Sequence, residues 1–445
     1  MIVSFSVSNY RSFHQEETLS LVASKRLESH PGHVSPIPAS DQGVLRAAVL
    51  YGANGAGKSN LFKALHFMKS LAVRVPSNPV GARRDVFRLS DGSAPTVLDL
   101  QFIANGQLYR YGVELDDRFV RGEWLFRLNR GRELRVFERE TAESGSVTVR
   151  HVWRKDKLRA LATVGGPPHQ TFLSSVCANL QKPDMDPHLR ATADWFAKHL
   201  QLIPPGATFS GLPTVLEGDT PFREFAASFL RAGATGLEDL AVEAADFDWQ
   251  EFERIVPEVV KRLSEQPQSS QESTELLTVD DGVDFHVAAG ARRCKRIMVK
   301  GVHLNAAGRP VKFPLTEESD GTIRLLNLVP ALHRPAVYFI DEIDRSLHPI
   351  LAREFLSYFL RHSPAESQCL TTTHESGLLD QDLLRRDEIW FAEKDSGGAT
   401  HLYSLLDFNV RNDLEIRKHY LQGRFGAVPF TAPLENLMPT PEQKA

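Results

Sequence analysis

The chain has 445 residues, 42% hydrophobic and 24% charged, with a net charge of −4 at pH 7. These values are typical of a globular protein with more than one core, and they exclude a disordered or uniformly basic chain, although not a local basic patch. The cysteines Cys177, Cys294 and Cys369 lie far apart and form no CxxC pair, which indicates neither a zinc site nor a disulfide framework and is typical of a reducing cytoplasm. No apolar run approaches the roughly 18 residues of a membrane span. We therefore expect a cytoplasmic protein that does not enter the membrane.

The first predicted elements lead to a glycine-rich turn. Residues 2–8 alternate between polar and apolar side chains, which predicts a strand, and residues 24–45 are polar and contain proline and glycine, which predicts a loop. Residues 47–51 form an apolar run that ends at Gly52, which predicts a buried strand entering a turn. Apolar residues then recur at helical spacing over 59–72, so a helix is expected to follow the turn.

The middle of the chain changes from strands to helices. Residues 97–154 contain several runs of aromatic and β-branched residues separated by turn residues, which predicts an antiparallel β-meander. Residues 187–264 have helical periodicity but no sustained heptad, which predicts a helical insertion and not a long coiled coil. Residues 264–274 are typical of a polar linker, and two strands are expected shortly after it. From residue 322 onward, helices and strands are expected to alternate.

This order of elements predicts an α/β fold with four parts. They are an N-terminal lobe with the glycine turn and the meander, a helical insertion with its linker, a C-terminal lobe, and a flexible tail, at residues 1–180, 181–280, 281–430 and 431–445.

The glycine-rich turn predicts a phosphate-binding loop. Residues 52–59 match the pattern G-x-x-x-x-G-K-S/T at every fixed position. Glycines let successive backbone N–H groups point at phosphate oxygens, and the following helix presents the positive end of its dipole. A chance match is the alternative, and the strand before and the helix after argue against it. The predicted nucleotide-binding residues are Gly52, Asn54, Gly55, Gly57, Lys58, Ser59 and Asn60, with Lys58 on the outer phosphates and Ser59 also on Mg²⁺.

A second apolar run, residues 336–340, ends in two carboxylates, Asp341 and Glu342. A buried parallel strand delivers its last residues to the sheet edge where ligands bind. Asp341 is expected to hold Mg²⁺, and Glu342 to orient and deprotonate the attacking water. Many strands end in acids, so the alternative is a structural role.

A third apolar stretch, residues 369–373, is expected to be a strand that ends at His374. A histidine at the end of a neighbouring strand can contact a γ-phosphate, whereas an ordinary surface or core histidine is the alternative. The order of the motifs favours the catalytic interpretation. Residues 318–322 precede a helix about 20 residues before the carboxylates, and residues 346–348 directly follow them.

This order of motifs resembles that of ABC-type ATPases of the SMC, RecF and OLD class. The signature Ser-Gly-Gly-Gln of that class is present in the altered form Ser319-Asp320-Gly321-Thr322. The chain is most similar to prokaryotic stand-alone RloA-like proteins, described as AAA-family ATP-binding proteins, through NYRSF at 9–13, YRYGVEL at 109–115, EWLF at 123–126 and the segment 415–429. The resemblance implies a P-loop NTPase with an ABC-type ATPase head.

The resemblance also implies a head-to-tail homodimer that forms with ATP. In it, Ser319 and Gly321 would cap the γ-phosphate held by the other chain. Asp320 departs from the family by placing a carboxylate near that phosphate. No glutamine is assigned to the Q-loop, and Arg11 is expected either near the nucleotide or in a structural role.

Three uses of ATP follow as hypotheses. The resemblance implies a dimeric switch in antiphage (antiviral) defence that regulates a partner effector, a nuclease or toxin-like protein. The alternative is a RecF/SMC-like ATPase of DNA repair or chromosomes, with DNA on basic residues such as 83–84, 292–296 and Lys300. The third hypothesis, a scaffold that binds ATP without turnover, is disfavoured by Glu342.

Overall fold

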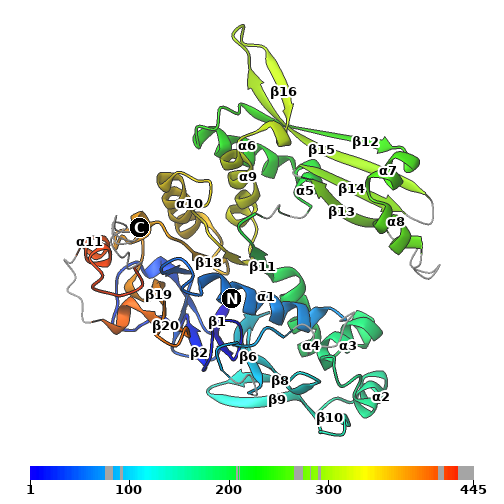
Figure 1. Ribbon diagram of the computed structural model, residues 1–445. Coiled ribbons are helices and arrows are strands. Elements are labelled where there is room, and N and C mark those ends of the chain that lie inside the picture. The colour runs from blue at the N-terminus through cyan, green and yellow to red at the C-terminus, as the bar shows by residue number, and fades with distance from the viewer. Residues whose placement is uncertain are drawn as a thin grey trace, which may run out of the picture. The chain divides into compact units, whose positions relative to one another are not determined.

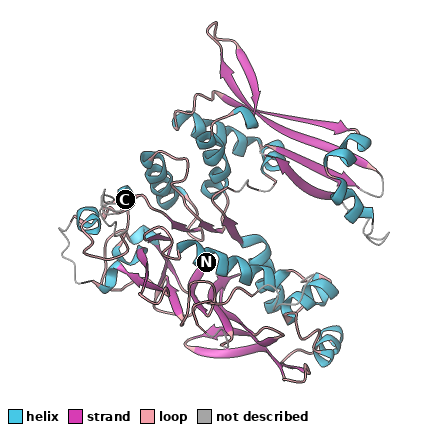
Figure 2. Ribbon diagram, in the orientation of Figure 1, coloured by secondary structure: helices cyan, strands magenta, loops and turns pink. Residues whose placement is uncertain are grey.

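The computed structural model describes residues 1–75, 84–90, 94–206, 209, 211–264, 274–280, 282–288, 292–408 and 415–428 (Figures 1 and 2). The chain forms two compact units. The first unit is Met1–Leu202 with Pro335–Asp344 and Arg353–Ala445, and the second is Ile203–Arg334 with Arg345–Ala352. The predicted tail, residues 431–445, lies outside the described residues.

A seven-stranded sheet in the first unit contains the predicted meander. Its strand order is β10-β9-β8-β7-β6-β1-β2, and every pairing is antiparallel. The strands are β1 Ile2–Ser8, β2 Glu17–Ser20, β6 Thr96–Ala104, β7 Gln107–Leu115, β8 Val120–Asn129, β9 Arg132–Thr141 and β10 Val147–His151. Asn105 and Gly106 both have positive φ, as a two-residue hairpin turn between β6 and β7 requires. The meander and the N-terminal strand are confirmed.

A six-stranded sheet in the same unit has the order β11-β17-β18-β5-β19-β20. Its strands are β5 Ala47–Tyr51, β11 Leu200–Ile203, β17 Val337–Ile340, β18 Gln368–Thr372, β19 Ile389–Lys394 and β20 Thr400–Ser404. β17, β18, β5 and β19 run parallel. Their carboxyl ends therefore meet at one edge of the sheet, where the three predicted motifs follow β5, β17 and β18.

One expected helix is missing between β18 and β19. That stretch instead contains two short 3-10 helices, η8 Ser376–Leu378 and η9 Arg386–Glu388. The Glu375 side chain accepts a bond from Gly377 N, and Asp380 accepts one from Asp382 N. Such local side-chain bonds compete with the helical backbone pattern.

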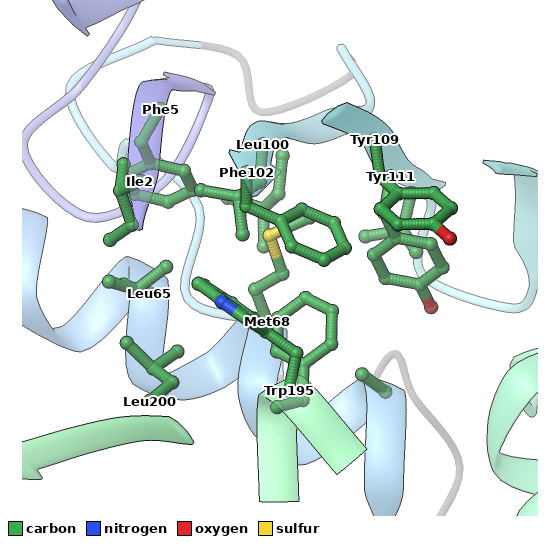
Figure 3. Close-up of a cluster of buried hydrophobic side chains, with 14 of the residues drawn as sticks. Ile2, Phe5, Leu65, Met68, Leu100, Phe102, Tyr109, Tyr111, Trp195 and Leu200 are labelled. Atoms are coloured by element: carbon green, nitrogen blue, oxygen red, sulfur yellow. The ribbon is translucent and has the colours of Figure 1, made fainter. Parts of the chain in front are cut away.

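Helix α1, Lys58–Val73, packs against the seven-stranded sheet in a large buried core. Figure 3 shows Leu65 and Met68 of α1 in one buried cluster with Phe102 of β6 and Trp195. The Phe102 and Trp195 ring centroids lie 4.4 Å apart. Because α1 begins at the glycine-rich turn, this packing fixes the direction in which the turn is presented.

The first unit has further helices and a small hairpin. They are α2 Asp156–Val164, α3 Phe172–Asn179, α4 Pro187–Asp194, the π-helical turn η4 Trp195–His199 and α11 Ile416–Leu421, with the hairpin strands β3 Val34–Pro36 and β4 Gly43–Leu45. The hairpin lies in the stretch 24–45 that was expected to be only a loop.

The second unit is a mixed helix and sheet domain. Its sheet consists of β12 Asp239–Phe247, β13 Thr274–Asp280, β14 Val283–Ala288, β15 Arg293–Leu304 and β16 Pro310–Pro314. Its helices are α5 Leu212–Gly218, α6 Thr220–Ala232, α7 Trp249–Ile255, α8 Pro257–Ser264 and α9 Asp320–His333. Helix α10, Pro349–His362, begins in the second unit and ends in the first.

The two compact units divide the chain at other positions than the predicted parts. The units change at 202/203, 334/335, 344/345 and 352/353, whereas the parts were expected to change at 180/181, 280/281 and 430/431. The boundary expected at 280/281 falls inside the hairpin of β13 and β14, and β12 makes the predicted helical insertion partly β. β12 forms because it pairs along its whole length with β15, from Asp239↔Val302 to Phe247↔Cys294. Because β12 depends on a partner strand that is distant in sequence, the local residue pattern of β12 does not indicate a strand.

No helix in the described ranges combines the length and the hydropathy needed to cross a bilayer.

Candidate nucleotide-binding site

The glycine-rich turn joins the central strand β5 to α1. Gly55 and Gly57 have φ values of +77° and +109°, which side chains other than glycine rarely adopt. A Cβ atom at Gly57 would lie 2.2 Å from Thr400 Oγ1 and 2.8 Å from Ser12 Oγ, whereas a Cβ at Gly55 would meet nothing within 4 Å. Position 57 therefore requires glycine both because of its backbone conformation and because there is no room for a side chain. Position 55 requires glycine because of its backbone conformation alone.

Lys58 is held inside the turn. Only 5% of this residue is exposed, and Nζ donates to the carbonyl oxygens of Gly52 at 2.7 Å and Ala53 at 3.2 Å. Burial lowers the pKa of Lys58 to about 8, although the carboxylates of Asp341, Asp344 and Glu342 act in the opposite direction. A phosphate bound by Lys58 would stabilise the charged lysine and raise this pKa.

The acidic residues after β17 lie beside the first turn of α1. Ser59 Oγ donates to Asp341 Oδ1 at 3.1 Å, and Thr372 Oγ1 donates to the same oxygen at 2.6 Å. Thr372 Oγ1 also accepts a bond from Glu342 N at 2.8 Å. Asp341 is 2% exposed. The predicted neighbours Ser59 and Asp341 are thus in direct contact.

His374 follows β18 and reaches the same place. Its Nδ1 lies 3.4 Å from Lys58 Nζ. Burial and the nearby Lys58 lower the pKa of His374, so the ring is neutral at pH 7. A cavity of about 430 Å³ is lined by these predicted residues: Asn54, Gly55, Gly57, Lys58, Ser59, Asn60, Glu342 and His374, together with Ala56. The structure thus brings the turn, the acidic strand end and the histidine together.

Polar contacts from Ser12, in the turn between β1 and β2, and from Thr400, the first residue of β20, support the glycine-rich turn. Ser12 Oγ accepts bonds from Asn60 Nδ2 at 2.8 Å and from Thr400 Oγ1 at 2.7 Å. Thr400 Oγ1 also lies 2.8 Å from the Ala56 carbonyl oxygen. Ser12 belongs to the NYRSF stretch that carried the family resemblance. That stretch is therefore part of the framework of the phosphate-binding loop.

A second cavity of about 410 Å³ shares Asn60 with the first and is lined by Arg11, Ser12, Arg88 and Lys394, among others. Arg11 is engaged by Asp85 at 2.5 Å. Arg11 therefore makes a structural ion pair at the wall of this cavity, and its approach to a nucleotide stays a prediction.

Ser319 and Gly321 are in the second unit, at the N-terminus of the 14-residue helix α9. Ser319 Oγ caps the helix by accepting a bond from Thr322 N at 3.2 Å, and both Ser319 and Asp320 are exposed. A Cβ atom at Gly321 would lie 2.8 Å from the Ser346 carbonyl oxygen, so the altered signature packs closely on the segment after the carboxylates.

Three of the basic residues considered for DNA, Arg84, Lys295 and Lys300, make ion pairs within the chain. The Arg84 side chain is 2% exposed and bonds to Asp117 at 2.5 Å, and Arg83 lies outside the described residues. Lys295 bonds to Glu217 at 3.2 Å, and Lys300 to Glu243 at 2.8 Å. Such partners leave these cations less available to phosphates.

Sequence reasoning missed four residues that complete the site: Ser12, Asp344, Thr372 and Thr400. Thr372 and Asp344 adjoin recognised motifs, so their position was a usable signal. No sequence signal pointed to Thr400, because it reaches the turn through the pairing of β19 with β20.

The chain matches a protein-family model described as "AAA domain, putative AbiEii toxin, Type IV TA system" over residues 47–171 and 197–380. A comparison with curated proteins gives no match. Among solved structures, the chain is similar to an SMC head bound to the C-terminal winged-helix domain of ScpA, with 14% identity, coverage of 91% of this chain and 97% of the other, and a TM-score of 0.41. It is also similar to the SMC head domain of Thermotoga maritima, with 11% identity, coverage of 91% and 98%, and a TM-score of 0.38.

The family match spans most of the chain and includes the glycine-rich turn, the acidic strand end and His374. The geometry at the carboxyl ends of β5, β17 and β18 is that of a P-loop nucleotide site in an α/β fold. The chain therefore belongs to the AAA-domain family described as putative AbiEii toxins of type IV TA systems.

Proposed function

We propose that this chain binds ATP with Mg²⁺ and hydrolyses it as an ATP-driven dimeric switch. The observation that carries the proposal is the cavity of about 430 Å³ in which the phosphate-binding turn meets Glu342 and His374. Members of an AAA family that carry this turn and an acidic strand end are expected to be ATPases.

The residues present fit a Mg²⁺ ion. Ser59 Oγ and Asp341 Oδ1 lie 3.1 Å apart, and both are the hard oxygen ligands that Mg²⁺ prefers. Within the described part of the chain, no group of three or more His, Cys, Asp and Glu residues forms a metal site. Mg²⁺ bound with a nucleotide needs only one or two protein ligands, because phosphates and water supply the rest. The ion would neutralise charge on the phosphates.

The side chains have distinct roles in this proposal. Lys58 and the backbone N–H groups of the turn bind the outer phosphates, helped by the positive end of α1. Glu342 orients the attacking water and accepts its proton. His374, neutral at pH 7, donates one ring N–H toward the γ-phosphate. The nucleoside extends toward the second cavity, which begins at Asn60 and is lined by Arg11.

The switch needs a second chain. Ser319 and the N-terminus of α9 are exposed, so they can reach a nucleotide held by a partner. ATP would then join the two chains, and hydrolysis would release them. The RloA-like resemblance and the toxin named in the family description support a role in antiphage defence through an effector partner. We propose a cytoplasmic location on the same grounds.

The test compares turnover of the wild-type chain and Glu342→Gln under saturating Mg-ATP. Removing a general base is expected to slow hydrolysis by about 10²–10⁴-fold, while nucleotide binding, measured separately by calorimetry, persists. A wild-type chain without turnover would contradict the ATPase proposal.

The partner is tested by recovering tagged Glu342→Gln from its own cells with ATP present. Stoichiometric recovery of a nuclease or toxin-like protein supports the defence role. Recovery of DNA alone, released by salt, would contradict it and favour the RecF/SMC-like alternative.

A further inference from the structure

Three consecutive threonines connect the end of β18 to the end of β17. We call Thr371, Thr372 and Thr373 the threonine ladder. All three are at most 1% exposed, and each hydroxyl donates to the neighbouring acidic segment or the strand before it. Thr371 Oγ1 donates to the Ile340 carbonyl at 2.9 Å, and Thr373 Oγ1 donates to Asp344 Oδ1 at 2.8 Å.

We propose that two residues of this ladder, Thr372 and Thr373, position the catalytic groups: Thr372 sets Asp341 and Glu342, and Thr373 with Asp344 sets His374. The inference rests on the proposed function, since it concerns the same site. These residues act through the groups that they hold and are positioning residues.

The Thr372 hydroxyl both donates and accepts a hydrogen bond. It donates to Asp341 Oδ1 at 2.6 Å and accepts from Glu342 N at 2.8 Å. Glu342 has φ of +52°, a left-handed conformation that is unfavourable for a residue other than glycine. The bond to its N–H fixes this backbone, and Ile343 N adds a bond to the Thr372 carbonyl at 3.1 Å. One hydroxyl therefore sets both the metal-binding carboxylate and the turn that presents the base.

Thr373 and Asp344 hold the backbone around His374. Both Asp344 oxygens are used: Oδ1 accepts from Thr373 Oγ1 at 2.8 Å, and Oδ2 lies 3.4 Å from His374 N. Thr373 Oγ1 in turn accepts from Glu375 N at 2.9 Å. The residues before and after the histidine are thus tied to the acidic segment.

Thr371 supplies an internal control. It is as buried as Thr372 and lies in the same strand, but successive strand residues point to opposite faces of the sheet. Its hydroxyl bonds to main-chain carbonyls of Ile340 and Thr372 and to no carboxylate. Thr371→Val thus removes a buried hydroxyl of equal size without disturbing Asp341 or Glu342.

The experiment measures two quantities for wild type, Thr372→Val, Thr372→Ser, Thr373→Val and Thr371→Val. The first is the affinity for Mn²⁺ with a non-hydrolysable ATP analogue, followed by electron paramagnetic resonance. The second is kcat with Mg-ATP, and thermal unfolding confirms that each variant is folded.

For Thr372→Val, both Mn²⁺ affinity and kcat are expected to fall by about 10–100-fold, the usual effect of losing a residue that orients a metal ligand. Thr372→Ser should restore both. Thr373→Val should lower kcat and leave Mn²⁺ affinity unchanged, and Thr371→Val should change neither. Equal losses in Thr371→Val and Thr372→Val would overturn the proposal, as would wild-type behaviour in Thr372→Val. A wild-type chain that binds Mn²⁺ with the analogue but does not turn over ATP would contradict only the proposed function, because the Mn²⁺ readout still tests the ladder.

Discussion

The two helix N-termini considered for phosphate binding differ in their surroundings. The N-terminus of α1 is enclosed: Lys58 is 5% exposed, and Ser12 and Thr400 brace the turn before it. The N-terminus of α9 is exposed at Ser319 and is capped by the Ser319 side chain. Both have the positive dipole end that favours an anion. The enclosed N-terminus of α1 can bind a phosphate with groups of its own chain. The exposed N-terminus of α9 presents its groups outward, as a contact with another chain requires.

The largest effect on turnover is expected at the enclosed N-terminus of α1. Lys58→Ala removes the cation that contacts the outer phosphates, and turnover should fall by about 10²–10³-fold or more. The readout is steady-state phosphate release. Lys69→Ala is the matched control, because Lys69 lies in the same helix, has a pKa likewise lowered by burial to about 8, and donates to Leu200 O away from the site. Unchanged turnover in Lys58→Ala would contradict the assignment of the turn.

The next largest effect is a difference in nucleotide affinity between substitutions of two glycines in the same turn. Gly57→Ala forces a Cβ to within 2.2 Å of Thr400 Oγ1 at φ of +109°, whereas Gly55→Ala meets open space. Nucleotide affinity, measured by calorimetry, should be lost in Gly57→Ala. In Gly55→Ala it should fall only by the factor that corresponds to roughly 1–2 kcal/mol of backbone strain. Equal effects would show that the bracing by Thr400 and Ser12 does not shape the turn.

A smaller effect is expected from pH. The pKa of Lys58 is lowered to about 8 in the free chain by burial, and bound phosphate should raise it. Nucleotide affinity should therefore be complete below pH 8 and fall as pH rises above 8, by at most about tenfold per unit. Calorimetry from pH 7 to 9.5 measures this, with Lys58→Arg as the control that stays charged. An affinity of the wild type that stays constant up to pH 9.5 would contradict it.

The smallest effect is expected on dimer affinity, from a substitution at the exposed N-terminus of α9. Asp320→Asn removes a negative charge beside the phosphate proposed to bind there, and should strengthen ATP-dependent dimerisation by a few fold, about 0.3–1 kcal/mol. Glu317→Gln removes another exposed carboxylate in the preceding 3-10 helix and serves as its control. Sedimentation velocity across a concentration series gives both dimer affinities. A weaker dimer in Asp320→Asn would show that the carboxylate supports the contact.

The enclosed site was the more predictable of the two from sequence. The pattern of residues 52–59 and the apolar runs before Asp341 and His374 placed these groups at one sheet edge, because parallel strands present their carboxyl ends together. The bracing by Thr400 depends on the pairing of β20 with β19, which the sequence does not encode locally. The second unit was predicted less well, because β12 becomes a strand only through β15. The role of α9 rested on a family resemblance.

The measurement that most directly tests the central claim is the mass of Glu342→Gln in solution with and without saturating Mg-ATP, by light scattering after size-exclusion chromatography. The proposed switch predicts twice the monomer mass with Mg-ATP, the monomer mass without it, and the monomer mass in both conditions for Glu342→Gln combined with Ser319→Arg. A Glu342→Gln chain that binds Mg-ATP and remains monomeric would contradict the dimeric switch.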